Sequence, residues 1–136
     1  TIDGVVLLDG AGYDVPRQIA AAGPILRRMY LRAFGSDEPT QRLVSPISHA
    51  AAPNAARFLI VHSARRADSA AQAAAFARAL VDGGTAVRVE PVDDSHSGIF
   101  RRFGEAGHVT TDIATAFIEA SLASRGHPAV PGGTNP

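Results

Sequence analysis

The chain has 136 residues, the length of one domain, and contains no Cys. A disulfide framework, a thiol nucleophile and a thiolate metal site are therefore excluded. Its 13 acidic and 13 basic residues balance and no apolar run approaches the roughly 20 residues of a membrane helix, so we expect neither nucleic acid nor membrane as a partner.

The first half of the chain begins with a strand and continues as helix. Residues 4–8 form an unbroken apolar run, which predicts a strand buried in a parallel sheet. A helical stretch follows from about Tyr13, with Pro16 in its first turn, and Gly23-Pro24 is predicted to divide it. Residues 35–39 are typical of a turn, and residues 43–53 of a loop.

The second half alternates strands and helices. Strands are predicted over residues 58–62 and 85–92. The helix between them is predicted from about Ser69 to Val81, opened by a capping box of Ser69 and Gln72. A last helix is predicted to open within residues 109–112, with a Thr or Asp cap.

This order predicts an α/β protein in which three parallel strands carry helices on both faces, a three-layer sandwich. We assign residues 1–125 to this unit and residues 126–136, rich in Pro and Gly, to a flexible tail. The strand over residues 4–8 is too apolar for a free edge, so we expect a missing N-terminal segment or a second protomer to pair at Val5, Val6 and Leu7.

The chemistry of a parallel α/β sheet lies beyond the carboxyl ends of its strands. The three loops there are predicted at residues 9–14, 63–68 and 93–98, and the last of them holds His96. A His in this place can act as a general base if an acid holds its second ring nitrogen. Neighbouring strands lie about 4.8 Å apart, so Asp68 can reach His96, and Asp14 is the alternative acid.

From residue 4 to residue 123 the chain resembles the C-terminal part of an α/β-hydrolase, in the carboxylesterase and kynurenine-formamidase-like branch. The resemblance rests on an ordered set of strings: Tyr13-Asp14-Val15-Pro16, residues 30–35, Ser45-Pro46-Ile47-Ser48-His49, Asp68-Ser69-Ala70-Ala71-Gln72, the helix over residues 76–80, and His96-Ser97-Gly98-Ile99-Phe100 running on to Phe103-Gly104. It implies a serine hydrolase acting on small carboxylic esters or aryl formamides without a cofactor. In that reading His96 is the base and Asp68 the acid of a Ser-Asp-His triad.

The chain departs from this family at the nucleophile. It has no Gly-x-Ser-x-Gly elbow and no His-Gly-Gly-like oxyanion loop, both of which the family carries before the strands seen here. We therefore expect this chain to be the C-terminal portion of a longer polypeptide, with the isolated chain inactive. The alternative is an inactive truncated module that assembles through its exposed first strand.

Ordinary structural roles are predicted for the other polar residues. His62 is expected to be a core His, and His49 to brace its own loop, whereas His108 and His127 are expected to be exposed. The pair Arg65-Arg66 is typical of a solvated face, and the spacing of His and Asp matches no metal motif. Asp68 itself has a second interpretation, as an acid at a helix N-terminus.

Overall fold

The computed structural model describes residues 2–124, in which three parallel strands form one sheet; the predicted tail lies outside this range. The strands are β1 (Val5–Leu8), β2 (Arg57–Ser63) and β3 (Ala86–Val92), in the spatial order β1-β2-β3. Val5 pairs with Phe58, which in turn pairs with Val87, so the three strands end at the same edge.

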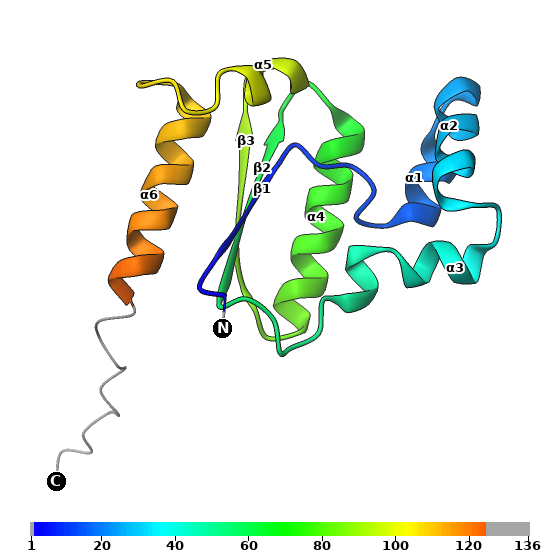
Figure 1. Cartoon of the computed structure of the whole chain (residues 1–136), viewed down its shortest axis with the longest axis horizontal. Coiled ribbons are helices and arrows are strands. Elements are labelled where there is room, and N and C mark those ends of the chain that lie inside the picture. The colour runs from blue at the N-terminus through cyan, green and yellow to red at the C-terminus, as the bar shows by residue number, and fades with distance from the viewer. Residues whose placement is uncertain (1, 125–136) are drawn as a thin grey trace, which may run out of the picture.

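Two long helices sandwich this sheet. α4 (Ala67–Asp82) covers one face and α6 (Val109–Ala123) covers the other (Figure 1). Alternate residues of β2 serve the two cores, because side chains along a strand point to opposite faces: Phe58 and Ile60 pack with α4, while Leu59 and Val61 pack on the α6 side. The predicted three-layer α/β sandwich is confirmed.

An arm of short helices separates β1 from β2 and extends away from the sheet beyond α4 (Figure 1). It contains α1 (Val15–Ala21), α2 (Pro24–Phe34), α3 (Glu38–Leu43) and the 3-10 helix η1 (Pro46–His49). The predicted break at Gly23-Pro24 is confirmed. α3 was not predicted; it forms because the Asp37 carboxylate accepts a hydrogen bond from the Thr40 amide at 2.9 Å.

The start of α4 differs from the prediction, and the capping box is absent. The helix begins at Ala67, two residues early, and Arg66 caps it without a side-chain hydrogen bond. Ser69 instead donates from Oγ to Asp9 Oδ1 at 2.6 Å, and Gln72 bonds to the backbone of Asp14 at 2.8 and 3.1 Å. The two side chains that local pattern assigns to a cap are used to join α4 to the β1 loop.

Of the last two helices, α5 (His96–Arg101) was not predicted, and α6 (Val109–Ala123) begins where it was predicted but without the predicted cap. His96 is not in an irregular loop, because it opens α5, which Ser95 Oγ caps by accepting from the Gly98 amide at 3.0 Å. α6 begins after His108, which makes no side-chain cap, so the predicted Thr or Asp cap is wrong. α5 lies across the end of the sheet, above the carboxyl ends of the strands (Figure 1).

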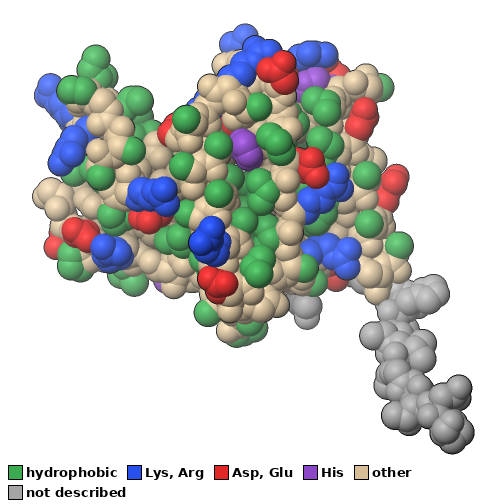
Figure 2. All heavy atoms as spheres, turned by 180° about the vertical axis from the view of Figure 1, so that it is seen from behind, with side chains coloured by type: hydrophobic (Ala, Val, Ile, Leu, Met, Phe, Trp, Pro, Cys, Tyr) green, Lys and Arg blue, Asp and Glu red, His purple; other side chains and the backbone are tan. Residues whose placement is uncertain are grey.

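Both edges of the sheet are open within residues 2–124, since β1 and β3 each pair on one side only. Figure 2, the rear view, shows hydrophobic side chains gathered in the middle of the molecule between Arg and acidic side chains. Across the part of the chain that the structure describes, none of the helices has the length and apolar character that crossing a membrane demands.

Candidate active site

Asp9 is the residue on which the site is built. It follows β1 directly, with a left-handed φ of 41°, a conformation that Asp adopts more readily than most residues. Its amide donates to Val61 O at 2.7 Å, which fastens the turn to β2. The side chain is fully buried and points across the end of the sheet toward α5.

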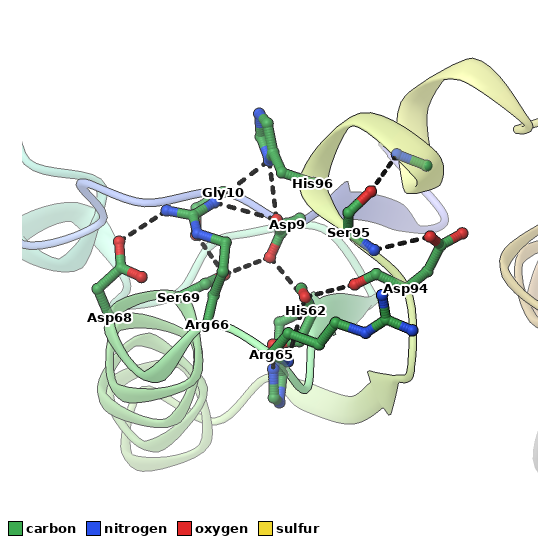
Figure 3. A network of polar contacts seen from close by, with 12 residues as sticks. Asp9, Gly10, His62, Arg65, Arg66, Asp68, Ser69, Asp94, Ser95 and His96 are labelled. Carbon is green, nitrogen blue, oxygen red and sulfur yellow. Dashed lines mark hydrogen bonds and ion pairs between the residues drawn. The ribbon is translucent and has the colours of Figure 1, made fainter.

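His96 meets this carboxylate from the first turn of α5 (Figure 3). Its Nδ1 atom lies 2.8 Å from Asp9 Oδ2. With Asp9 ionised, this contact is a hydrogen bond when Nδ1 carries the proton, because an unprotonated ring nitrogen and a carboxylate oxygen are both acceptors. The neutral imidazole then carries its lone pair on Nε2, which is the arrangement of a general base held by an acid.

Four donors converge on the Asp9 carboxylate. Oδ1 accepts from the Ser63 amide at 2.8 Å and from Ser69 Oγ at 2.6 Å, and Oδ2 accepts from Arg66 Nη1 at 3.0 Å and from His96 Nδ1. An ionised carboxylate offers about four lone-pair sites, so every site is used. Burial raises the pKa of Asp9, but these hydrogen bonds together lower it below its ordinary value, which keeps the group charged.

Arg66 occupies the space between two carboxylates and the imidazole (Figure 3). Its Nη1 atom binds Asp9 and lies 3.2 Å from His96 Nδ1, while its Nη2 atom donates to Asp68 Oδ2 at 2.6 Å. The side chain is 28% exposed, so the prediction of a solvated Arg65-Arg66 face is wrong for Arg66. It holds for Arg65, which forms an exposed ion pair with Asp93.

The second ring nitrogen of His96 is accessible. The side chain is 53% exposed, and Nε2 makes no hydrogen bond to any residue between 2 and 124. The ring packs edge-on against Phe100, with centroids 4.8 Å apart, which limits its rotation. Nε2 can therefore take a proton from a group that enters from outside the described part of the chain.

A second pair, Asp94 and His108, fastens α5 to α6. His108 Nε2 lies 3.1 Å from Asp94 Oδ2, and His108 is buried, which corrects the prediction that it is exposed. A Cβ on Gly98 would collide with the Asp94 carboxylate, so Asp94 sits directly beneath the first turn of α5. The hydrogen bond from His108, and then that from the Ser95 amide, lower the pKa of Asp94.

The structure does not bring either predicted acid to His96. Asp68 binds Arg66 and lies 3.5 Å from Gln18 Nε2 instead, with Arg66 between it and the imidazole. Asp14 caps α1 by accepting from the Arg17 amide at 3.2 Å. Both expected contacts are therefore corrected in favour of Asp9.

The remaining His residues have local partners. His62 Nδ1 contacts Ser63 O at 3.2 Å and is half-buried, and His49 Nε2 contacts Leu43 O at 2.6 Å within the loop. His127 lies outside the described residues. Among residues 2–124, no three His, Asp or Glu side chains are grouped so that they could hold a metal ion.

Sequence reasoning missed Asp9 and Arg66 for identifiable reasons. Asp9 follows the first strand directly, which is a valid signal, but the order of the strands and the left-handed turn that aims its side chain are tertiary features. Arg66 is next to Arg65, which is exposed, and two adjacent Arg residues are both predicted to be solvated from the sequence alone. The position of His96 at the carboxyl edge of the sheet agrees with the prediction.

Comparison of the chain with family models, with curated proteins and with solved structures found no match. The geometry of the site therefore stands as the basis for a function.

Proposed function

We propose that Asp9 and His96 are the acid and base of a serine-hydrolase triad that acts on small carboxylic esters or aryl formamides, with the serine supplied from outside this sequence. One observation carries the proposal: a buried, ionised carboxylate holds Nδ1 of a His whose Nε2 is open, at the carboxyl edge of a parallel sheet. The resemblance to the α/β-hydrolases agrees with this, with Asp9 in place of Asp68 or Asp14.

The proposed reaction follows from the tautomer of His96. As a serine Oγ attacks the carbonyl carbon of the substrate, Nε2 takes the hydroxyl proton, and the Asp9 carboxylate stabilises the imidazolium. Nε2 then returns this proton to the departing alkoxide or amine, which leaves an acyl-serine. Nε2 then takes a proton from a water molecule that attacks the acyl carbon, and it returns this proton to serine Oγ as the carboxylic acid leaves, which restores the enzyme.

The edge of the sheet beside β1 is the place we propose for the serine-bearing strand. A parallel neighbour of β1 would end about 4.8 Å from the end of β1, where Asp9 begins the site. The opposite edge, β3, carries Arg88, Glu90 and Pro91, residue types that block pairing, whereas β1 carries none. β1 is thus the edge suited to a further strand.

The first test uses the chain itself. Purified chain should not turn over p-nitrophenyl acetate above the buffer rate, because it lacks the nucleophile. Turnover that disappears in His96→Ala would mean that the nucleophile lies within this chain, and it would overturn the division of the triad proposed here.

The second test restores a serine. The chain is expressed within the full coding sequence of its gene, and ester turnover is measured. Asp9→Asn and His96→Ala should each lower kcat by about 10⁴-fold. Asp68→Asn serves as the matched control and should have a much smaller effect. Equal losses in Asp68→Asn and Asp9→Asn, or an active His96→Ala, would contradict the assignment.

A second function is favoured by the same edge. The chain would then be a non-catalytic module that assembles through β1, whose four residues are all only half-buried. A groove beside β1, lined by Gly4, Val6, Phe117 and Leu122 among others, continues this apolar surface onto α6. In that case the Asp9–His96 pair would have a structural role, and the extended protein of the second test would be inactive.

A further inference from the structure

Arg66 is the only Arg or Lys, among residues 2–124, that contacts the buried carboxylate of Asp9. Its guanidinium also lies against His96 Nδ1 at 3.2 Å, although Nδ1 and Nη1 are both donors when Nδ1 is bonded to Asp9. A base, its acid and a permanent cation therefore share one site. The proposed reaction assigns no task to that cation.

A buried carboxylate must be compensated, because burial disfavours its charge. Without Arg66, the two neutral donors Ser63 N and Ser69 Oγ would remain, and His96 would be the only group able to supply a positive charge. His96 would then be drawn into the imidazolium form. An imidazolium has no lone pair on Nε2, so it cannot accept a proton from serine.

We propose that Arg66 is a positioning residue that supplies the counter-charge of Asp9, so that His96 rests as the neutral imidazole with its proton on Nδ1. This inference rests on the proposed function, because a resting base is needed only if His96 abstracts a proton. Arg66 acts through Asp9 and contacts no reacting atom.

Asp68 has the role of anchor for Arg66. It binds Nη2 at 2.6 Å while Asp9 binds Nη1 at 3.0 Å, so the planar guanidinium is held at both ends. The two carboxylates and one guanidinium leave a net charge of −1 beside a neutral His96, which reaches zero when the ring takes a proton. The cluster thus favours the transient imidazolium while Arg66 prevents it from being the resting state.

The test reads the imidazole directly and needs no turnover. In chain labelled with ¹⁵N-histidine, the shifts of the two ring nitrogens near neutral pH distinguish the neutral Nδ1–H form from the imidazolium. His96→Ala identifies the signals. The native chain should give the Nδ1–H pattern, and Arg66→Met should move it toward the imidazolium pattern at the same pH.

Two further variants make the result specific. Arg66→Lys keeps the charge and should restore most of the native pattern, and Arg65→Met, which removes a neighbouring but exposed Arg, should leave it unchanged. A native pattern in Arg66→Met, or an equal shift in Arg65→Met, would overturn the inference. Since no serine takes part, failure here leaves the triad proposal standing, and failure of the turnover tests leaves this measurement intact.

Discussion

At the residue scale, Asp9 combines three properties that seldom occur together by chance. It has a left-handed backbone, no solvent exposure and four hydrogen-bond donors on its carboxylate. Asn shares its shape but not its charge, so a single substitution separates the electrostatic contribution of Asp9 from its packing.

Asp9→Asn should lower the free energy of unfolding by about 1–3 kcal/mol at neutral pH, because an amide cannot accept from all four donors. It should also flatten the acid limb of the stability curve. The pKa of Asp9 is lower in the folded chain than in the unfolded chain, so its contribution is present above the unfolded pKa and is lost as pH falls through the folded pKa.

Urea unfolding over a series of acidic pH values measures both effects. The slope of the unfolding free energy against pH reports how many more protons the unfolded chain binds than the folded chain, and this number should fall by up to one in Asp9→Asn. An exposed site provides the control, because Asp93→Asn removes only the surface ion pair with Arg65 and should change stability little. An unchanged acid limb in Asp9→Asn would show that the pKa of Asp9 is the same in the folded and the unfolded chain, which would contradict the lowered pKa.

Gly98 offers a second test at this scale. Gly98→Ala would place a methyl group against the Asp94 carboxylate, which must then move and lose its hydrogen bonds to His108 and the Ser95 amide. We expect a destabilisation of about 1–3 kcal/mol, measured by urea unfolding. The neighbouring Ser97→Ala, at an exposed position of the same helix, should have almost no effect. Equal stability of the two variants would contradict the role given to the Asp94–His108 contact in holding α5 against α6.

At the element scale, polar side chains in the first turns of α4 bind the loop after β1 and do not cap the helix. Ser69 and Gln72 point at the loop after β1 and bind Asp9 and the backbone of Asp14. α4 gives up a side-chain cap, and its packing against the sheet compensates, since Ala73, Phe76 and Leu80 are buried there. The helix therefore fixes the β1 loop as one unit with the sheet.

Gln72→Ala should loosen this connection. The Asp14 amide donates to Gln72 Oε1 at 2.8 Å, and in the variant it should exchange with solvent several-fold faster, as measured by hydrogen exchange. The global free energy of unfolding should fall by about 1–3 kcal/mol, because Gln72 is buried and its loss leaves the Asp14 amide without a partner, while the Asp14 carbonyl keeps its hydrogen bond from the Gln18 amide. Arg78→Ala, on the exposed side of α4, is the control. If the Asp14 amide exchanged as fast in Arg78→Ala as in Gln72→Ala, the explanation would be contradicted.

At the scale of the whole molecule, the two edges of the sheet differ in kind. β3 carries charged residues and Pro91, while β1 presents Val5-Val6-Leu7-Leu8 beside the groove on α6. An apolar edge of this composition is prone to pair with another chain when nothing covers it. The isolated chain should therefore self-associate.

Size-exclusion chromatography with light scattering over a range of concentrations tests this expectation. The chain should form a dimer whose fraction rises with concentration, and Leu122→Lys, which puts a charge in the groove, should weaken the dimer about tenfold or more. Leu122 is 55% exposed, so the variant should fold. Ile25→Lys on the distant α2 should leave the dimer unchanged. A monomer at every concentration would count against pairing at β1.

Much of the fold could be predicted because its signals are local. Residues 4–8 and 58–61 are unbroken apolar runs, and Gly23-Pro24 breaks a helix wherever it stands in the fold. The failures are side chains with two competing uses. Ser69 and Gln72 fit a capping box, but each bonds to a partner that is distant in sequence. Asp68 lies in the first turn of α4, as its second interpretation predicts, and its carboxylate binds Arg66 and not His96.

The sequence by itself determined the α/β class, the parallel order of strands and helices, and the position of His96 after the last strand. These follow from the spacing of the hydrophobic residues, which is a local property of a few neighbouring positions, and from the order of the elements along the chain. Only the tertiary structure decided that the acid beside His96 is Asp9, that Arg66 separates Asp68 from the ring, and that His108 is buried. Those outcomes depend on strand order and on the direction of a left-handed turn, which bring Asp9 and His96 into contact although they lie 87 positions apart in the chain.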